Sequence, residues 1–176
     1  MKIAIIGYSG TGKSTLARKL ANFYQLPVLH LDSVHFKENW QECSDEDMNQ
    51  AVLNFLNSNA EWIIEGNYRR ICPQRFQEAD QIIFLSYNRF TCLKNVIHRY
   101  RTYHGAATRP DMAKGCEEKL DKEFLFWILY KGRTQKRKHA YIEIASMAKC
   151  SHIFKNRRQL WKYLKILGVK NYEASM

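Results

Sequence analysis

Gly7-Tyr8-Ser9-Gly10-Thr11-Gly12-Lys13-Ser14-Thr15 matches the phosphate-binding pattern G-x-x-x-x-G-K-[ST] at every fixed position. Its glycines allow the tight turn that aims successive backbone N–H groups at an anion, and the N-terminus of the following helix adds partial positive charge. We expect Lys13 to reach the β- and γ-phosphates of a nucleotide and Ser14 to offer its hydroxyl to Mg²⁺. The residues expected to bind the nucleotide are Gly7, Ser9, Gly10, Thr11, Gly12, Lys13, Ser14 and Thr15.

The segments on either side of this stretch decide between two interpretations of it, a phosphate loop and an ordinary flexible loop. Before it, Lys2-Ile3-Ala4-Ile5-Ile6 is a short apolar run typical of a buried parallel strand. After it, Ser14–Ala21 has the pattern of an amphipathic helix, with Leu16, Leu20 and Phe23 at helical spacing. Strand, loop and helix occur in the order that the motif requires, so the phosphate-binding interpretation is favoured.

The length and composition indicate one domain. The chain has 176 residues, within the roughly 100–200 of a single domain, and its 45% hydrophobic content can fill a core. We therefore expect a single domain over residues 1–176. No apolar run approaches the about 18 residues of a membrane span, so we expect a cytoplasmic protein without a membrane partner.

The cysteines argue against a disulfide framework and against a zinc site. There are five of them, an odd number, and they are widely scattered without a C-x-x-C pair. Reduced and mostly buried thiols are the interpretation that we favour.

Four further apolar runs follow the first, and each has the length of a strand. They are Pro27–Leu31, Trp62–Ile64, Asp80–Leu85 and His152–Phe154. Helical patterns separate them, for example Asn88 through Tyr103. Strands that alternate with helices predict a doubly wound, three-layer α/β/α domain around a five-stranded parallel sheet.

Acidic side chains come directly after two of these strands. In an open parallel sheet, ligands bind beyond the carboxyl ends of the strands, so Asp32 and Glu65 should face the phosphate loop. We expect Asp32 to orient an acceptor hydroxyl, accept its proton or hold a Mg²⁺-bound water, although it would serve equally well as a helix N-cap. Glu65, followed by Gly66, is the candidate second acid behind Mg²⁺, and Arg69 or Arg70 is a candidate ligand for an anionic group on the acceptor.

Histidines near the second strand have different expected roles. His30 lies within the strand, and we expect it to pack in the sheet rather than take part in catalysis. His35 and Trp40 follow on an irregular stretch, where they are candidates for lining a substrate pocket.

Residues from about 104 to 140 have the pattern of a lid. The stretch from His104 to Cys116 contains two glycines and a proline, which favours a loop, and Asp121 to Tyr130 then resumes helical spacing. Arg133 and Arg137 follow, so the segment resembles a hinged, arginine-bearing lid.

Positive charge is concentrated in the C-terminal third. Residues 131–170 contain twelve lysines and arginines against one glutamate, which equals the formal net charge of +11 of the whole chain. This concentration favours an anionic ligand or partner, which leaves nucleotide phosphates, a phosphorylated substrate and nucleic acid as alternatives.

Most of the chain resembles the small bacterial P-loop proteins known as DNA topology modulation proteins, relatives of adenylate kinase. The stretches that carry the resemblance are Gly7–Thr15, His30-Leu31-Asp32 with His35, Trp62–Tyr68, Thr108–Met112, Gly115-Cys116, Glu118–Asp121, and Phe124 with Trp127. The phosphate loop specifies only the superfamily, whereas the stretch from Arg109 to Asp121 is closer to a family signature.

The likeness to nucleoside monophosphate kinases implies a strand order of 2-3-1-4-5, Mg²⁺-ATP as donor and a lid that closes over the phosphates. It also implies that Glu65-Gly66 stands where those kinases carry Asp-Gly, and that Arg69 binds the acceptor phosphate. Arg99 occupies the position of an arginine that those kinases carry at the end of the helix after strand four. Those kinases usually carry another arginine four residues earlier, where this chain has Asn95, so the preferred base of the donor is open.

Two functions follow from these patterns. The first is an ATP-dependent kinase of a nucleotide or other small molecule, in which Lys13, Asp32, Arg99 and a lid arginine act on the transferred phosphoryl group. In that reading Arg109 is a candidate substrate ligand from the lid. The second is a nucleotide-responsive DNA-binding protein.

The kinase is favoured, because we find neither the Asn-Lys-x-Asp motif of GTPases nor a DNA-reading motif. The chain is also too short for the helical domain of ring-forming ATPases. We expect a monomer or a homodimer.

Overall fold

A computed structural model describes residues 1–105, 112 and 116–169. Its centre is one parallel sheet of five strands in the order β2-β3-β1-β4-β5. The strands are β1 (Lys2–Gly7), β2 (Val28–His30), β3 (Trp62–Glu65), β4 (Gln81–Leu85) and β5 (Cys150–Phe154). The predicted parallel sheet and its strand order are confirmed.

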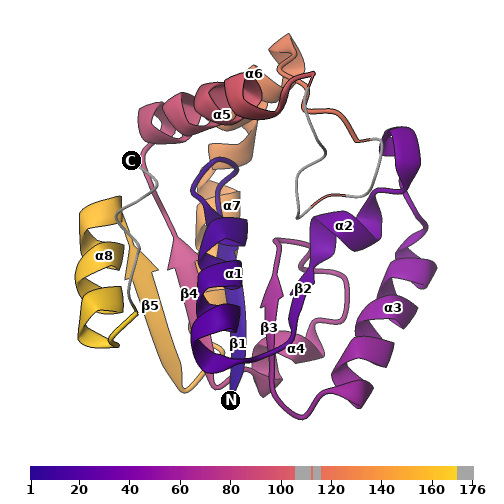
Figure 1. The fold of residues 1–176 in the computed structure, drawn as a ribbon, viewed down its shortest axis with the longest axis vertical. Helices are drawn as coiled ribbons and strands as arrows, with labels where there is room; N and C mark the ends of the chain where they lie inside the picture. Colours follow the sequence, from indigo (N-terminus) through magenta and orange to yellow (C-terminus); the bar gives the residue numbers. More distant parts are fainter. Residues whose placement is uncertain (106–111, 113–115, 170–176) are drawn as a thin grey trace.

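Helices connect the strands and cover the sheet. In chain order they are α1 (Lys13–Tyr24), α2 (Leu31–His35), α3 (Asp45–Ser58), α4 (Gln74–Glu78), α5 (Arg89–Tyr103), α6 (Lys122–Leu129), α7 (Gln135–Ala145) and α8 (Arg157–Ile166). Two short 3₁₀ turns, η1 (Glu38–Trp40) and η2 (Lys131–Arg133), lie among them. Figure 1 shows α1 in front of the sheet and α7 behind it, which gives the three layers of the predicted fold.

The core and the helix starts follow from the sequence pattern. Ile3, Ile5 and Ile6 of the central strand are fully buried, because helices cover both faces of β1. Helix α3 begins at a Ser44 side chain that accepts a hydrogen bond from the Asp47 backbone N–H at 3.0 Å. The strands all point toward α5 and α6, so their carboxyl ends meet below these two helices (Figure 1).

The second strand ends one residue earlier than the pattern predicts. Leu31 opens α2 instead of closing β2, and the Ser33 hydroxyl donates to the His30 carbonyl at 2.7 Å. This local hydrogen bond turns the chain before Leu31, which becomes buried. As a result Asp32 lies in the first turn of a helix, where a carboxylate is favoured, and His30 rather than Asp32 is the N-cap.

The apolar face of α1 is narrower than the spacing indicates. Leu16 and Leu20 are buried, but Phe23 is 41% exposed and packs edge-on against Tyr24, with ring centroids 4.8 Å apart. The prediction for Phe23 is therefore wrong, because the last turn of α1 packs on the core through Ala21 and Tyr24 and leaves Phe23 on the outer side of the helix.

The predicted lid segment is described in part. Helix α6 packs against α5 above the sheet, whereas α7 buries Tyr141 and Ile144 and packs on β4. Arg109, predicted to bind substrate, lies outside the described residues.

The five cysteines are all free thiols, and four of them are buried. Among the described residues, no three His, Cys, Asp or Glu side chains gather as they would around a zinc ion. A helix of the length and apolarity needed to cross a bilayer does not occur in residues 1–105 and 116–169.

Candidate active site

The phosphate loop needs glycine where it passes close to neighbouring backbone. Gly7 has φ 153°, and a Cβ there would lie 2.5 Å from the Leu85 carbonyl oxygen. Gly10 has φ 80°, and its Cβ would lie 2.5 Å from the Cys92 carbonyl oxygen. Any side chain at either position would force the loop away from β4 or α5, so these contacts fix the position of the loop.

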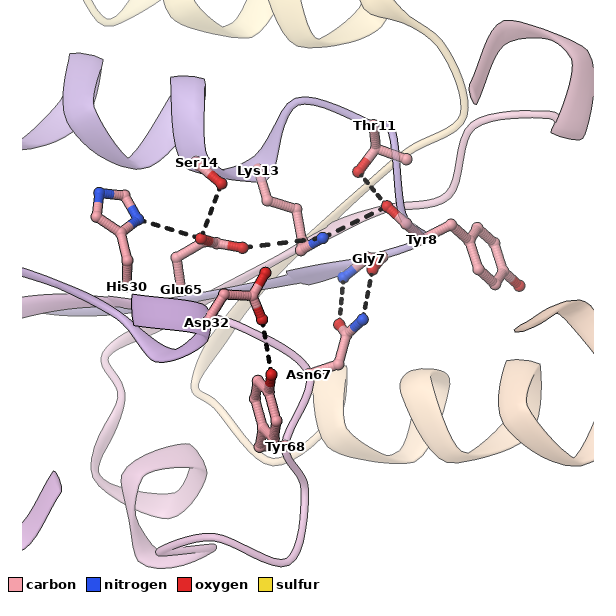
Figure 2. A network of polar contacts seen from close by, with 10 residues as sticks. All are labelled: Gly7, Tyr8, Thr11, Lys13, Ser14, His30, Asp32, Glu65, Asn67 and Tyr68. Atoms are coloured by element: carbon pink, nitrogen blue, oxygen red, sulfur yellow. Dashed lines mark hydrogen bonds and ion pairs between the residues drawn. The ribbon is translucent and has the colours of Figure 1, made fainter. Parts of the chain in front are cut away.

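Lys13 and Ser14 both contact the carboxylate that ends β3. The Ser14 hydroxyl donates to Glu65 Oε2 at 3.0 Å, and Lys13 Nζ lies 3.8 Å from Glu65 Oε1. Lys13 Nζ also donates to the Tyr8 carbonyl at 3.4 Å. Figure 2 shows the Lys13 amine between these two acceptors. The loop therefore holds its lysine in place before any phosphate is present.

His30 completes this network. The sheet register pairs His30 with Glu65 on adjacent strands, so both side chains project from the same face, and His30 Nδ1 lies 3.1 Å from Glu65 Oε2. Burial raises the pKa of the Glu65 carboxyl, but the His30 hydrogen bond, the Lys13 charge and the Ser14 hydrogen bond outweigh it and lower that pKa. Glu65 is thus a buried, ionised acid directly behind Ser14.

Asn67 ties the end of β3 to the start of the loop. Its side-chain amide accepts from the Gly7 N–H at 3.0 Å and donates to the Gly7 carbonyl at 2.8 Å (Figure 2). This two-way contact fixes the loop relative to Glu65, so that the acid and the lysine keep their separation.

Asp32 lies on the opposite side of the site from α1. The Tyr68 hydroxyl donates to Asp32 Oδ1 at 2.8 Å. Burial, and then the Asp32 charge, raise the pKa of Tyr68 well above its ordinary value, so the phenol remains a donor to the carboxylate. A carboxylate held in this way can accept a proton from a hydroxyl in the cleft.

A cleft of about 1370 Å³ joins these groups to the region below α5 and α6. The loop residues Lys13 and Ser14 line it on one side, and Asp32 and Arg69 on the other. Gly66 also lines it at φ 141°, where a Cβ would lie 2.7 Å from the Leu31 Cβ. The structure therefore brings the predicted phosphate loop, Asp32 and Arg69 to one space, with Glu65 buried behind them.

The predicted catalytic arginines take three different positions. Arg99 lines the cleft and forms an ion pair with Glu118. Arg137 lines the cleft and lies over the Trp127 ring, 4.4 Å from its centroid. Their action on a phosphoryl group stays a prediction.

Arg133 is engaged beside the loop rather than in the large cleft. Its guanidinium donates to the Ile128 and Tyr87 carbonyls, both at 2.8 Å, and contacts the Cys92 sulfur at 3.0 Å. It also lies 4.2 Å from the centroid of the Tyr8 ring. In this conformation Arg133 fastens η2 to the phosphate loop and to the end of β4.

His35 and Trp40, the two residues predicted to line a substrate pocket after β2, differ in their relation to the cleft. Trp40 lines the cleft, and its indole N–H donates to the Glu117 carbonyl at 3.0 Å. His35 packs against Tyr68, with ring centroids 4.9 Å apart, and is not among the described residues that line the cleft. His35 therefore supports Tyr68 rather than facing the cleft.

Sequence reasoning missed three partners of these residues, namely His30, Asn67 and Tyr68. His30 was expected to pack in the sheet, and it does, but it also contacts Glu65. Asn67 and Tyr68 follow Glu65-Gly66 at a strand end, and that position was the available signal.

Comparisons with known proteins show what the chain and its fold are similar to. Residues 3–85, less than half of the chain, match the model of the ATPase family associated with various cellular activities. A shikimate kinase from Acinetobacter baumannii in complex with shikimate has a similar structure at 18% identity and a TM-score of 0.59, covering 98% of this chain and 95% of that chain. A shikimate kinase from Bacteroides thetaiotaomicron has 15% identity and a TM-score of 0.53, covering 96% and 98%.

An uncharacterized protein from Eubacterium ventriosum is similar as well, at 17% identity and a TM-score of 0.51, covering 97% of this chain and 99% of that chain. No curated protein sequence matches the chain significantly. At these identities the likeness shows the fold alone, which is the parallel α/β fold of the two shikimate kinases.

Proposed function

We propose that this chain with a P-loop kinase fold is a Mg²⁺-ATP-dependent phosphotransferase that acts on a nucleotide or another small molecule. One observation carries the proposal: Lys13 of the phosphate loop and the Asp32 carboxylate line the same cleft, with Glu65 ionised behind the loop. A phosphate-binding lysine beside a carboxylate base is what transfer of a phosphoryl group to an acceptor requires.

The residues present fit Mg²⁺. It prefers oxygen ligands and is usually held by one or two carboxylates together with substrate phosphates, so a cage of many acids is not needed. The Ser14 hydroxyl and the Glu65 carboxylate, 3.0 Å apart, supply such oxygens next to the loop. When bound, the ion would neutralise charge on the β- and γ-phosphates.

The remaining roles fall on the cleft side chains. Asp32, oriented by Tyr68, would orient the acceptor hydroxyl, accept its proton or hold a Mg²⁺-bound water. Arg69 is exposed at the cleft and would bind an anionic group of the acceptor. Arg99 of α5 and Arg137 of the lid would act on the transferred phosphoryl group, which requires Arg99 to exchange Glu118 for the ligand, and Arg109 of the lid would bind the substrate.

A transfer assay with purified protein tests this function. Radiolabelled or mass-tagged ATP and Mg²⁺ would be offered with nucleoside monophosphates, nucleosides and small hydroxylated metabolites, and products would be separated by chromatography. We expect the wild type to transfer a phosphoryl group to one class of acceptor. We expect Lys13→Ala to transfer none. Absence of transfer to every acceptor, with ATP still bound, would contradict the proposal.

A second function has one observation in its favour, which is the basic outer face of α8. Arg158, Lys162 and Lys165 are all exposed on this helix. They support a nucleotide-responsive DNA-binding protein, as the likeness to DNA topology modulation proteins implies.

We also propose that the chain acts as a single domain, as monomer or homodimer, in the cytoplasm, where ATP and Mg²⁺ are available.

A further inference from the structure

We infer that Arg75 of α4 is a positioning residue for the acceptor, because it holds from beneath the backbone segment that presents Arg69 and Arg70 to the cleft. The segment is Tyr68–Cys72. This role rests on the proposed function, in which Arg69 binds an anionic group of the acceptor. Arg75 itself is not among the described residues that line the cleft, so it would act only through the segment.

Arg75 is a buried cation without an acid partner. Its side chain is 0% exposed, and its guanidinium lies 4.1 Å from the centroid of the Phe76 ring. The ion pairs among the described residues all involve other side chains. Burial lowers the pKa of Arg75 to about 10, so the group is still charged at neutral pH. A buried charge is costly unless its neighbours satisfy it, so its hydrogen bonds decide its role.

The guanidinium is satisfied by backbone carbonyls of this one short segment. Nη2 of Arg75 donates to the Tyr68 carbonyl at 2.8 Å. Nη1 donates to the Cys72 carbonyl at 3.1 Å and also to the Ile71 carbonyl. Carbonyl dipoles that point into the same space repel one another unless a cation lies between them. Arg75 therefore holds both ends of the segment in a curve with these carbonyls turned inward.

The far end of the segment has a second hold, from Asn49 of α3. Cys72 has φ 40°, which is uncommon for a residue other than glycine, and its N–H donates to Asn49 Oδ1 at 2.8 Å. A backbone in this region persists where its surroundings determine it, and such positions cluster at functional sites. Asn49 binds the N–H of Cys72 and Arg75 binds its carbonyl, so the conformation is fixed from two sides.

The residues between these contacts face the ligand. Arg69 and Arg70 are exposed and line the cleft, and Tyr68, just before them, orients Asp32. A long side chain binds an anion more tightly when its backbone is already fixed, because less freedom is lost on binding. Arg75 would therefore contribute to acceptor affinity without touching the acceptor.

Steady-state kinetics would separate this role from a general loss of stability. Arg75→Lys keeps the charge but replaces the planar guanidinium that reaches three carbonyls. We expect its KM for the acceptor to rise about tenfold, kcat to fall at most about fivefold, and the KM for ATP to stay within about twofold of wild type. Leu164→Ala, in a buried position of α8 that packs on β5, is the matched control. It should lower stability and leave the acceptor KM normal.

A double-mutant cycle tests whether Arg75 acts through Arg69. We expect Arg69→Gln alone to raise the acceptor KM about tenfold, and the addition of Arg75→Lys to raise it less than about twofold further. Independent effects that multiply would contradict the positioning role. A normal acceptor KM in Arg75→Lys, or an equal rise in Leu164→Ala, would contradict it as well.

Hydrogen exchange keeps this test apart from the test of the proposed function. The Ile71 and Cys72 amides should exchange faster in Arg75→Lys, while amides of the central strand β1 are unchanged. Unchanged exchange at both amides would overturn the hold on the segment. Arg75→Gln is the second variant, and failure of both variants to fold would make Arg75 a residue of the core only. A wild type that transfers to no acceptor, with the faster exchange present in Arg75→Lys, would instead overturn the proposed function.

Discussion

The Tyr68 hydroxyl donates to Asp32 Oδ1 at 2.8 Å, across 36 residues of sequence. The contact joins the first turn of α2 to the segment that follows β3, and it orients the carboxylate that we propose as the proton acceptor. Tyr68 is itself supported from behind by His35. The pair therefore makes separate predictions for the acid and for the group that positions it.

Asp32→Asn should lower the rate of phosphoryl transfer by at least about ten- to a hundredfold, because it removes the base but keeps the shape. Tyr68→Phe should cost only about fivefold, as expected for the loss of one positioning hydrogen bond. Steady-state kinetics with the acceptor found in the transfer screen would measure both. Equal effects of the two substitutions would contradict the assignment of Asp32 as the base.

Lys13→Ala should abolish productive use of the triphosphate while the fold is retained. The side chain lies at the cleft, and its partners keep other contacts: Glu65 keeps Ser14 and His30, and the Tyr8 carbonyl keeps the Thr11 hydroxyl. We expect a loss of about 10³-fold or more in transfer, with an unchanged circular dichroism spectrum. The exposed Lys162→Ala is the matched control, and wild-type turnover in Lys13→Ala would exclude this loop as the active site.

Glu65 should make the stability of the protein sensitive to acid. Its pKa in the fold is below the ordinary value of 4.5, so the ionised form stabilises the fold fully above pH 4.5, and this contribution is lost as the pH falls through the lowered pKa. Chemical unfolding of wild type and Glu65→Gln between pH 7 and pH 3 would measure it. The difference between them should shrink below about pH 4.5, and parallel profiles would refute the buried, ionised acid.

Glu65→Gln should also lower turnover by about ten- to a hundredfold and raise the Mg²⁺ concentration needed for turnover. The reason is that the proposed metal site loses the Glu65 carboxylate, the charged group that β3 supplies. ATP binding without Mg²⁺ should change little. A variant that keeps the wild-type rate throughout a Mg²⁺ titration would show that Glu65 only supports the loop.

Arg137 and Arg133 should respond differently to replacement by alanine. Arg137 lines the cleft, so its loss should cost about 10³-fold in rate with little change in stability. Arg133 donates to two backbone carbonyls, so its loss should lower the free energy of unfolding by about 1–3 kcal/mol. Thermal unfolding and transfer rates would be compared for both variants, and a rate loss confined to Arg133→Ala would reverse the assignment.

Replacing Arg158, Lys162 and Lys165 together by Gln separates the two functions. The kinase hypothesis predicts full turnover in this triple variant. All three side chains are exposed, and none of them is among the described residues that line the cleft. DNA binding predicts that the salt dependence of duplex affinity becomes flatter by about two to three units. Loss of tight duplex binding in the variant, together with no transfer by the wild type, would favour the DNA-binding function.

The sequence alone determined the parts of this protein that depend on local pattern. The phosphate loop and the apolar runs of the strands are each set by neighbouring residues. The placement of Glu65 also followed from sequence, because the carboxyl ends of parallel strands meet at one edge of the sheet. Strand order came from resemblance, and the structure confirms it.

Only the tertiary structure decided which side chains meet. His30 contacts Glu65 because of the register of β2 on β3, and Arg157 reaches Asn95 because β4 and β5 are adjacent. Arg133 and Arg137 are four residues apart in sequence, yet one is held by backbone carbonyls beside Tyr8 and the other lines the cleft. Such contacts join residues through the packing of whole elements, and no local pattern encodes the register, tilt and separation on which they depend.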